Sequence, residues 1–68
     1  MEVNEVHIGN IISNFLNAYD IKVDDFAERI YCSRSSAYRI LKARHINTSL
    51  LLRISVALEH NFFQDVFF

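Results

Sequence analysis

The chain has 68 residues, which is enough for one small domain and leaves no room for a separate catalytic one. Hydrophobic residues make up 51% of it and charged residues 22%, a balance that indicates a folded globular domain and excludes a disordered chain. Proline is absent and glycine occurs once, which disfavours β-hairpins and favours short helices joined by polar turns. We therefore expect residues 1–68 to form a single all-α domain.

The location of the protein is indicated by what the sequence lacks. No apolar run approaches the roughly 18 residues that a membrane span requires, and the first residues lack the basic segment of a signal peptide. The single cysteine, Cys32, cannot form an internal disulfide, which agrees with a reducing compartment. We expect a cytoplasmic protein.

The first predicted helix begins near Val6 and runs to about Tyr19, because apolar residues recur along it at helical spacing. This stripe consists of Ile8, Ile11, Ile12, Phe15, Leu16 and Tyr19. Gly9 lies inside the helix, where it costs about 1 kcal/mol relative to alanine. Either another backbone passes close to Gly9, or the helix starts after it. A continuous apolar stripe is typical of a core-facing scaffold helix.

Two short helices and a tight turn are predicted between Val23 and Lys42. Their inward apolar positions are Phe26, Ala27 and Ile30 in the first helix, and Ala37, Ile40 and Leu41 in the second. Ser33 is expected to cap the second helix by accepting a hydrogen bond from the amide of Ser35 or Ser36. The outer face of that helix then carries arginine, serine, tyrosine and lysine, a set that suits the major groove of DNA.

The segment 23–42 resembles the helix-turn-helix of the lambda-repressor/Cro-like (xenobiotic-response-element) family of bacterial transcriptional regulators. Ala27 stands where that family has a small residue, usually alanine, and Ile30 matches the apolar residue three positions later. The family's turn is usually Gly-Val-Ser, whereas residues 31–33 are Tyr-Cys-Ser. A tyrosine at positive φ costs about 1 kcal/mol, which packing of its ring can offset. The resemblance implies a compact bundle of four to five helices with a central helix-turn-helix.

Basic residues are concentrated in one window, although the formal net charge of the chain is −1. Five of the seven lysines and arginines lie between Ser33 and Arg53, and all eight acidic residues lie outside that window. One face can therefore be positive while the rest of the surface repels phosphate. An ordinary solvated basic face is the alternative, but such faces usually mix both signs.

The candidate DNA-binding residues lie on the predicted recognition helix, about 34–42, and just after it. Arg34 is the best candidate to bond a guanine bidentately, and Ser35 and Arg39 are the next to meet base edges. Tyr38 is expected to contact DNA in preference to packing in the core. The residues expected to contact the phosphates of the DNA backbone are Ser33, Ser36, Lys42, Arg44 and His45, and Arg53 is a weaker candidate on the same side.

A further helix is predicted after Asn47, which is a good N-cap. Its broad apolar face is formed by Leu50, Leu51, Ile54, Ala57 and Leu58. Leu52 and Val56 fall on a second face, in line with Phe63 further along the chain. Apolar residues are thus more widely spread than one core seam requires, and something else should cover them.

The C-terminal aromatic segment, residues 61–68, holds four phenylalanines and a valine. Asn61 at its start is expected to cap the end of the preceding helix. The aromatic side chains fold back onto the bundle, or pack against a second copy, or the natural chain continues beyond them. For the second case the expected homodimer interface consists of Leu52, Val56, Phe62, Phe63, Val66, Phe67 and Phe68.

Metal and catalytic sites are not expected. His7, Cys32, His45 and His60 lack the paired short spacings of a zinc site, so no metal or other cofactor is predicted. No nucleophile elbow or glycine-rich phosphate loop accompanies the serines and histidines. We interpret the chain as a sequence-specific regulator that binds double-stranded DNA as a dimer. The alternative is a protein-interaction module, or an antitoxin-like protein, that binds a partner through its C-terminal aromatic surface.

Overall fold

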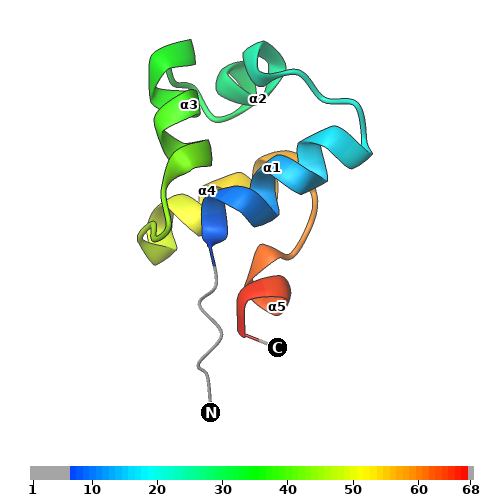
Figure 1. Cartoon of the computed structure of the whole chain (residues 1–68), viewed down its shortest axis with the longest axis vertical. Helices are drawn as coiled ribbons and strands as arrows, with labels where there is room; N and C mark the ends of the chain where they lie inside the picture. Colours follow the sequence, from blue (N-terminus) through cyan, green and yellow to red (C-terminus); the bar gives the residue numbers. More distant parts are fainter. Residues whose placement is uncertain (1–6, 68) are drawn as a thin grey trace.

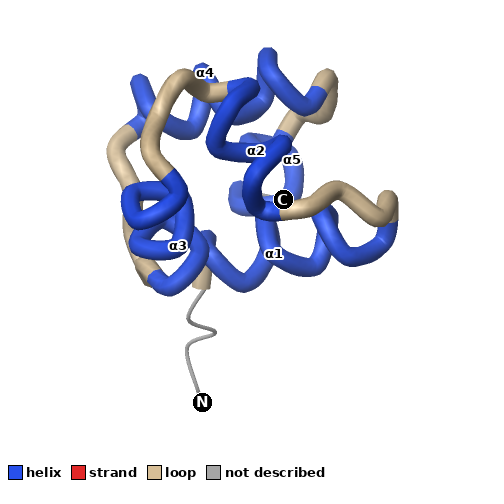
Figure 2. The backbone as a smooth tube through the Cα atoms, turned by 90° about the horizontal axis from the view of Figure 1, so that it is seen from above, coloured by secondary structure: helices blue, strands red, loops and turns tan. Residues whose placement is uncertain are grey.

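Five helices make up the computed structural model of the chain, which describes residues 7–67 (Figure 1). They are α1 (Ile8–Ala18), α2 (Val23–Arg29), α3 (Arg34–Lys42), α4 (Thr48–Leu58) and α5 (Phe62–Phe67). No strand occurs between residues 7 and 67, and turns or short loops join the helices (Figure 2). The predicted all-α bundle with a central helix-turn-helix is confirmed, in its five-helix form.

The helices are arranged around α1, which crosses the middle of the molecule (Figure 1). α2 and α3 pack against each other at one end, and α5 lies near the other end beside α1 and α4. The largest fully buried side chains come from several parts of this bundle, namely Ile12, Phe26, Ile30, Leu51, Ile54 and Phe62. A single hydrophobic core therefore joins the helix-turn-helix to the other three helices.

The ends of α1 differ slightly from the prediction. The helix starts at Ile8, because the Nδ1 atom of His7 caps it by accepting a hydrogen bond of 3.1 Å from the amide of Asn10. Val6, the predicted start, lies outside the described residues. Tyr19 was predicted on the buried stripe, but it is the C-cap residue and is 66% exposed, so that prediction was wrong. Its ring instead packs at a tilt against that of Phe15, with the ring centroids 4.6 Å apart and an angle of 39° between the ring planes.

Gly9 is where another backbone passes close to α1, which confirms the first of the two predicted alternatives. The amides of Ile8 and Gly9 donate hydrogen bonds of 3.1 and 2.9 Å to the carbonyl oxygens of Arg44 and Ala43. A Cβ atom on Gly9 would lie 2.6 Å from the oxygen of Ala43 and would also collide with that of Leu41. The start of α1 is thus joined directly to the end of α3.

Three helices end in the same way, at a non-glycine residue with positive φ. Among the described residues, the non-glycine residues with positive φ are Asp20 after α1 (φ 54°), Tyr31 after α2 (φ 58°) and Glu59 after α4 (φ 53°). At the end of α2, the amide of Tyr31 donates to Glu28 and the amide of Cys32 donates to Ala27, which satisfies two carbonyl groups of the last turn. The ring of Tyr31 is 91% exposed. Packing of this ring therefore does not offset the backbone strain, and the two hydrogen bonds hold the turn.

Asn61 has a different role from the predicted one. α4 ends at Leu58, and the left-handed residue that follows it is Glu59. Asn61 instead caps the start of α5, where its Oδ1 atom accepts hydrogen bonds of 3.1 and 3.3 Å from the amides of Phe63 and Gln64. The chain therefore turns immediately after α4 and brings α5 back onto the bundle.

The C-terminal aromatic segment folds back through Phe62, which is completely buried. Its ring packs edge-on against Phe15 and His60, at centroid distances of 5.2 and 4.6 Å. Phe62 therefore belongs to the core, and its inclusion in the predicted dimer interface was wrong. Phe63 is partly buried against the core. Phe68 and the side chains of Val66 and Phe67 lie outside the described residues.

The second apolar face of α4 remains open. Leu52 is 56% exposed and Val56 is 69% exposed, whereas Leu51 and Ile54 on the opposite side are buried. The predicted division of this helix into a core face and an additional apolar face is therefore present in the monomer.

Candidate nucleic-acid interface

The orientation of α3 is set by its N-cap and by one small buried residue. The hydroxyl of Ser33 accepts a hydrogen bond of 3.1 Å from the amide of Ser36, as expected for an N-cap. Ala37 is fully buried against the other helices. Because alanine is short, the backbone of α3 lies close to the bundle and its opposite face projects into solvent.

Most of the predicted DNA-contacting side chains are on this outer face or just after it. The exposed ones are Ser33, Arg34, Ser35, Tyr38, Arg39, Lys42, Arg44 and His45. Ser36 is half-buried, and its hydroxyl accepts a hydrogen bond from that of Ser33. Tyr38 is 47% exposed, so it is not a core aromatic. Arg53 is exposed but lies on α4, away from the α3 set in the sequence.

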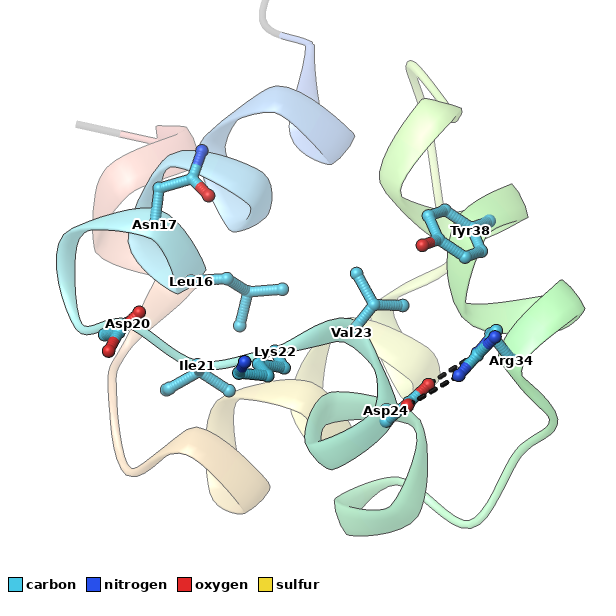
Figure 3. A pocket seen from close by; sticks show the side chains of 9 residues that line it. All are labelled: Leu16, Asn17, Asp20, Ile21, Lys22, Val23, Asp24, Arg34 and Tyr38. Carbon is cyan, nitrogen blue, oxygen red and sulfur yellow. Dashed lines mark hydrogen bonds and ion pairs between the residues drawn. The ribbon is translucent and has the colours of Figure 1, made fainter.

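The side chain of Arg34 forms a bidentate ion pair with Asp24 (Figure 3). The Nε atom donates to Oδ1 at 2.5 Å and the Nη2 atom donates to Oδ2 at 2.6 Å. Asp24 lies in the first turn of α2 and Arg34 is the first residue of α3, so the pair joins the starts of the two helices. The two side chains are 59% and 66% exposed.

The electrostatics of the pair follow from its geometry. The hydrogen bonds from Arg34 lower the pKa of the Asp24 carboxyl, with further lowering by the charges of Arg34 and Lys22. The same contact raises the pKa of the Arg34 guanidinium. Both groups are therefore charged at neutral pH. Because both are well exposed, the pair adds little to stability, and its main effect is to fix the position of the guanidinium.

A shallow groove of about 470 Å³ runs beside this pair (Figure 3). Arg34 and Tyr38 project toward it from α3, and the end of α1 and the connection to α2 form the opposite side. Its lining consists of Leu16, Asn17, Asp20, Ile21, Lys22, Val23, Asp24, Arg34 and Tyr38. Acidic, basic, amide and apolar groups thus share one open surface next to the start of the candidate recognition helix.

Between residues 7 and 67, no three His, Cys, Asp or Glu side chains lie close enough to hold a metal ion. None of the helices in the same range is long and apolar enough to cross a membrane.

Sequence reasoning missed three side chains that organise the structure. The first is Asp24, whose pairing with Arg34 has a detectable signal, namely an acidic residue ten positions before an arginine across a predicted turn. Ser55 is buried, and its hydroxyl accepts a hydrogen bond of 3.3 Å from the amide of Phe62. The ring of His60 packs edge-on against Phe62, and its Nε2 atom lies 2.7 Å from the Oδ2 atom of Asp65. The last two contacts depend on how α5 folds back, for which the sequence carries no local signal.

No protein-family model matches this chain, and comparison with curated proteins and with solved structures gives no match either.

Proposed function

We propose that this protein is a sequence-specific DNA-binding transcriptional regulator that places α3 in the major groove. The observation that carries the proposal is the division of α3 into a buried alanine face and an exposed polar and basic face. The exposed face includes Arg34, Arg39 and Lys42, and no acidic residue occurs from Ser33 to Arg53. A short helix with this composition, at one end of a small bundle, suits entry into a groove of DNA.

The candidate DNA-contacting side chains divide into two groups according to the part of the DNA that each can reach. Arg34, Ser35 and Arg39 are proposed to meet base edges, with Tyr38 beside them. The residues proposed to contact phosphates lie at the cap of α3, in its first turn, at its last residue or in the segment that follows it, namely Ser33, Ser36, Lys42, Arg44 and His45. In this arrangement the first group determines the sequence preference and the second supplies most of the affinity.

A homodimer is the second part of the proposal. One recognition helix reads only a few base pairs, and a twofold pair whose helices are about 34 Å apart would double the site. We propose that the apolar surface at Leu52 and Val56 packs against a second copy of the chain. By the helical spacing of the sequence, Phe63 falls in line with these two residues. The protein would act by occupying a promoter in the cytoplasm of a bacterium, without any chemical step.

Selection of duplexes from a random library tests this function. The wild type should enrich a twofold-symmetric sequence. Arg34→Ala should lose the base preference at one position of each half-site, because the lost contact is to a base. The binding free energy for the preferred sequence should weaken by about 1–3 kcal/mol. Lys42→Ala should weaken all sequences alike and lower the salt slope by about one per subunit, because its contact is to phosphate. Enrichment of the same sequence with equal affinity by all three proteins would refute the assigned roles.

A protein-interaction module is the second candidate, and the exposed Leu52 and Val56 favour it. An antitoxin-like protein would combine the two functions by binding both DNA and a protein partner. Folded protein that binds no duplex even at low salt would leave the interaction module as the better account.

A further inference from the structure

The ion pair between Asp24 and Arg34 uses only part of the guanidinium. An arginine side chain carries five N–H groups in one plane, one on Nε and two on each Nη atom. Asp24 occupies the side edge, through Nε and Nη2. The end edge, formed by one N–H group of Nη1 and the second one of Nη2, makes no bond with the described residues. The side chain is 66% exposed, so this edge is accessible.

We propose that Asp24 is a positioning residue for base recognition, which holds Arg34 so that the end edge of its guanidinium faces the O6 and N7 atoms of a guanine. This inference rests on the proposed function, because it assigns the means by which one residue of that site obtains its specificity. Two parallel N–H groups on the end edge match the two acceptors that guanine presents in the major groove. Asp24 itself has no suitable donor for a base and acts through Arg34.

The placement of Asp24 on another helix is what makes it effective. Arg34 begins α3, whereas Asp24 lies in the first turn of α2, which is anchored by the buried Phe26 and Ala27. The carboxylate is therefore held by the packing of α2, a different helix from the one that carries Arg34. Two hydrogen bonds to one carboxylate fix both the direction and the plane of the guanidinium, so its rotamers are already restricted before DNA arrives.

Asp25 provides a matched control. It follows Asp24 in the same turn, carries the same charge and is exposed, but it bonds to none of the described side chains. Replacing either residue removes one negative charge from the start of α2. Any general gain in affinity for phosphate should therefore be the same in the two variants, and only a change that depends on Arg34 should differ between them.

The test compares wild type, Asp24→Ala, Asp25→Ala and Asp24→Glu on four duplexes that differ only at the base assigned to Arg34. Affinities are measured by fluorescence anisotropy at one salt concentration, and circular dichroism confirms that each protein is folded. We expect Asp24→Ala to reduce the preference for guanine about three- to tenfold, since a free guanidinium adapts to other acceptors. Asp25→Ala should leave the preference unchanged, and Asp24→Glu should restore part of it.

Other outcomes would overturn the inference in distinguishable ways. An unchanged preference in Asp24→Ala would show that the carboxylate does not position the reading group. A larger gain in affinity for Asp24→Ala than for Asp25→Ala, with the same preference, would show that Asp24 competes with DNA for Arg34. If folded wild-type protein binds none of the duplexes, the proposed function itself fails, and the inference fails with it.

Discussion

The amide of Gly9 donates a hydrogen bond of 2.9 Å to the carbonyl oxygen of Ala43, at the point where the chain leaves α3. The neighbouring amide of Ile8 bonds in the same way to Arg44, so the first turn of α1 is fastened to the end of the candidate recognition helix. These two bonds use amides that have no partner within α1 itself. The position of α3 is therefore set at its start by the turn from α2 and at its end by α1.

Replacing Gly9 by alanine should destabilise the protein by about 1–3 kcal/mol, although alanine is the better helix former by about 1 kcal/mol. The new Cβ atom would meet the backbone oxygens of Leu41 and Ala43, which cannot move without shifting α3. Urea denaturation measures the change. Asn14→Ala is the control, because Asn14 is exposed on the same helix and should gain stability slightly. Equal stability of Gly9→Ala and wild type would contradict the close contact.

Tyr31→Gly should stabilise the protein by about 0.5–1 kcal/mol. The backbone of Tyr31 has a φ of 58°, which glycine adopts without strain, and the 91% exposed ring contributes almost no packing. The greater freedom of glycine in the unfolded chain removes part of the gain. Tyr31→Ala separates the two effects, because it removes the ring but keeps the strain. Loss of stability in Tyr31→Gly, measured by denaturation, would mean that the ring makes contacts that its exposure does not reveal.

Phe62→Ala should destabilise the protein by about 3–5 kcal/mol, because it leaves a cavity where a fully buried ring packs against Phe15 and His60. For a domain of this size such a loss can unfold most of the population. Tyr31→Ala again serves as a comparison, since it removes a ring that is exposed. Thermal melts followed by circular dichroism suffice for the measurement. If the two variants melt at similar temperatures, α5 is not part of the core.

The ion pair of Asp24 predicts a particular dependence of stability on pH. The pKa of Asp24 is lower in the folded protein than in the unfolded chain, so the unfolded state takes up this proton first as the pH falls. The contribution of the pair is thus complete above the ordinary aspartate range and is lost as the pH drops through the lowered pKa. The melting temperature of wild type should slightly exceed that of Asp24→Ala at about pH 7, and the gap should narrow as the pH falls below about 4. A gap that stays constant down to about pH 3 would rule out the pair as its source.

Val56→Lys should prevent dimer formation and leave the monomer folded. The side chain is 69% exposed, so the lysine can remain in solvent within the monomer, whereas a charge at the centre of an apolar interface is unfavourable. Sedimentation or light scattering at several protein concentrations measures the association. Ser49→Lys adds the same charge at an exposed position of α4 and should not affect it. A wild type that remains monomeric at every concentration would contradict the proposed dimer.

The parts of the fold that depend on nearby residues were predictable from the sequence. Ser33 and Asn47 cap α3 and α4 as expected, because capping is decided within three residues of the helix start. The bounds of α2 and α3 also agree with the predicted 23–42 segment. Asn61 was misassigned because the same residue type caps either end of a helix. The left-handed backbone of Glu59 shows that α4 has already ended before Asn61, so Asn61 caps the start of α5.

The parts that depend on the relative placement of helices were not predictable. The outward position of Arg34 follows from helical periodicity, but its pairing with Asp24 requires the crossing of α2 and α3. The burial of Phe62 and partial exposure of Phe63 require the direction in which α5 returns. A six-residue helix with phenylalanine at several positions has no single apolar stripe from which that direction could be inferred.

The most direct test of the DNA-binding account is a titration of a labelled random-sequence duplex by fluorescence anisotropy across a series of salt concentrations. Lys42 and Arg44 are the charged residues assigned to phosphates in each subunit, so a dimer should neutralise about four phosphates. The logarithm of the association constant should then fall linearly with the logarithm of salt concentration, with a slope of about −3 to −4. Absence of binding by folded protein at low salt, or binding that does not change with salt, would contradict the account.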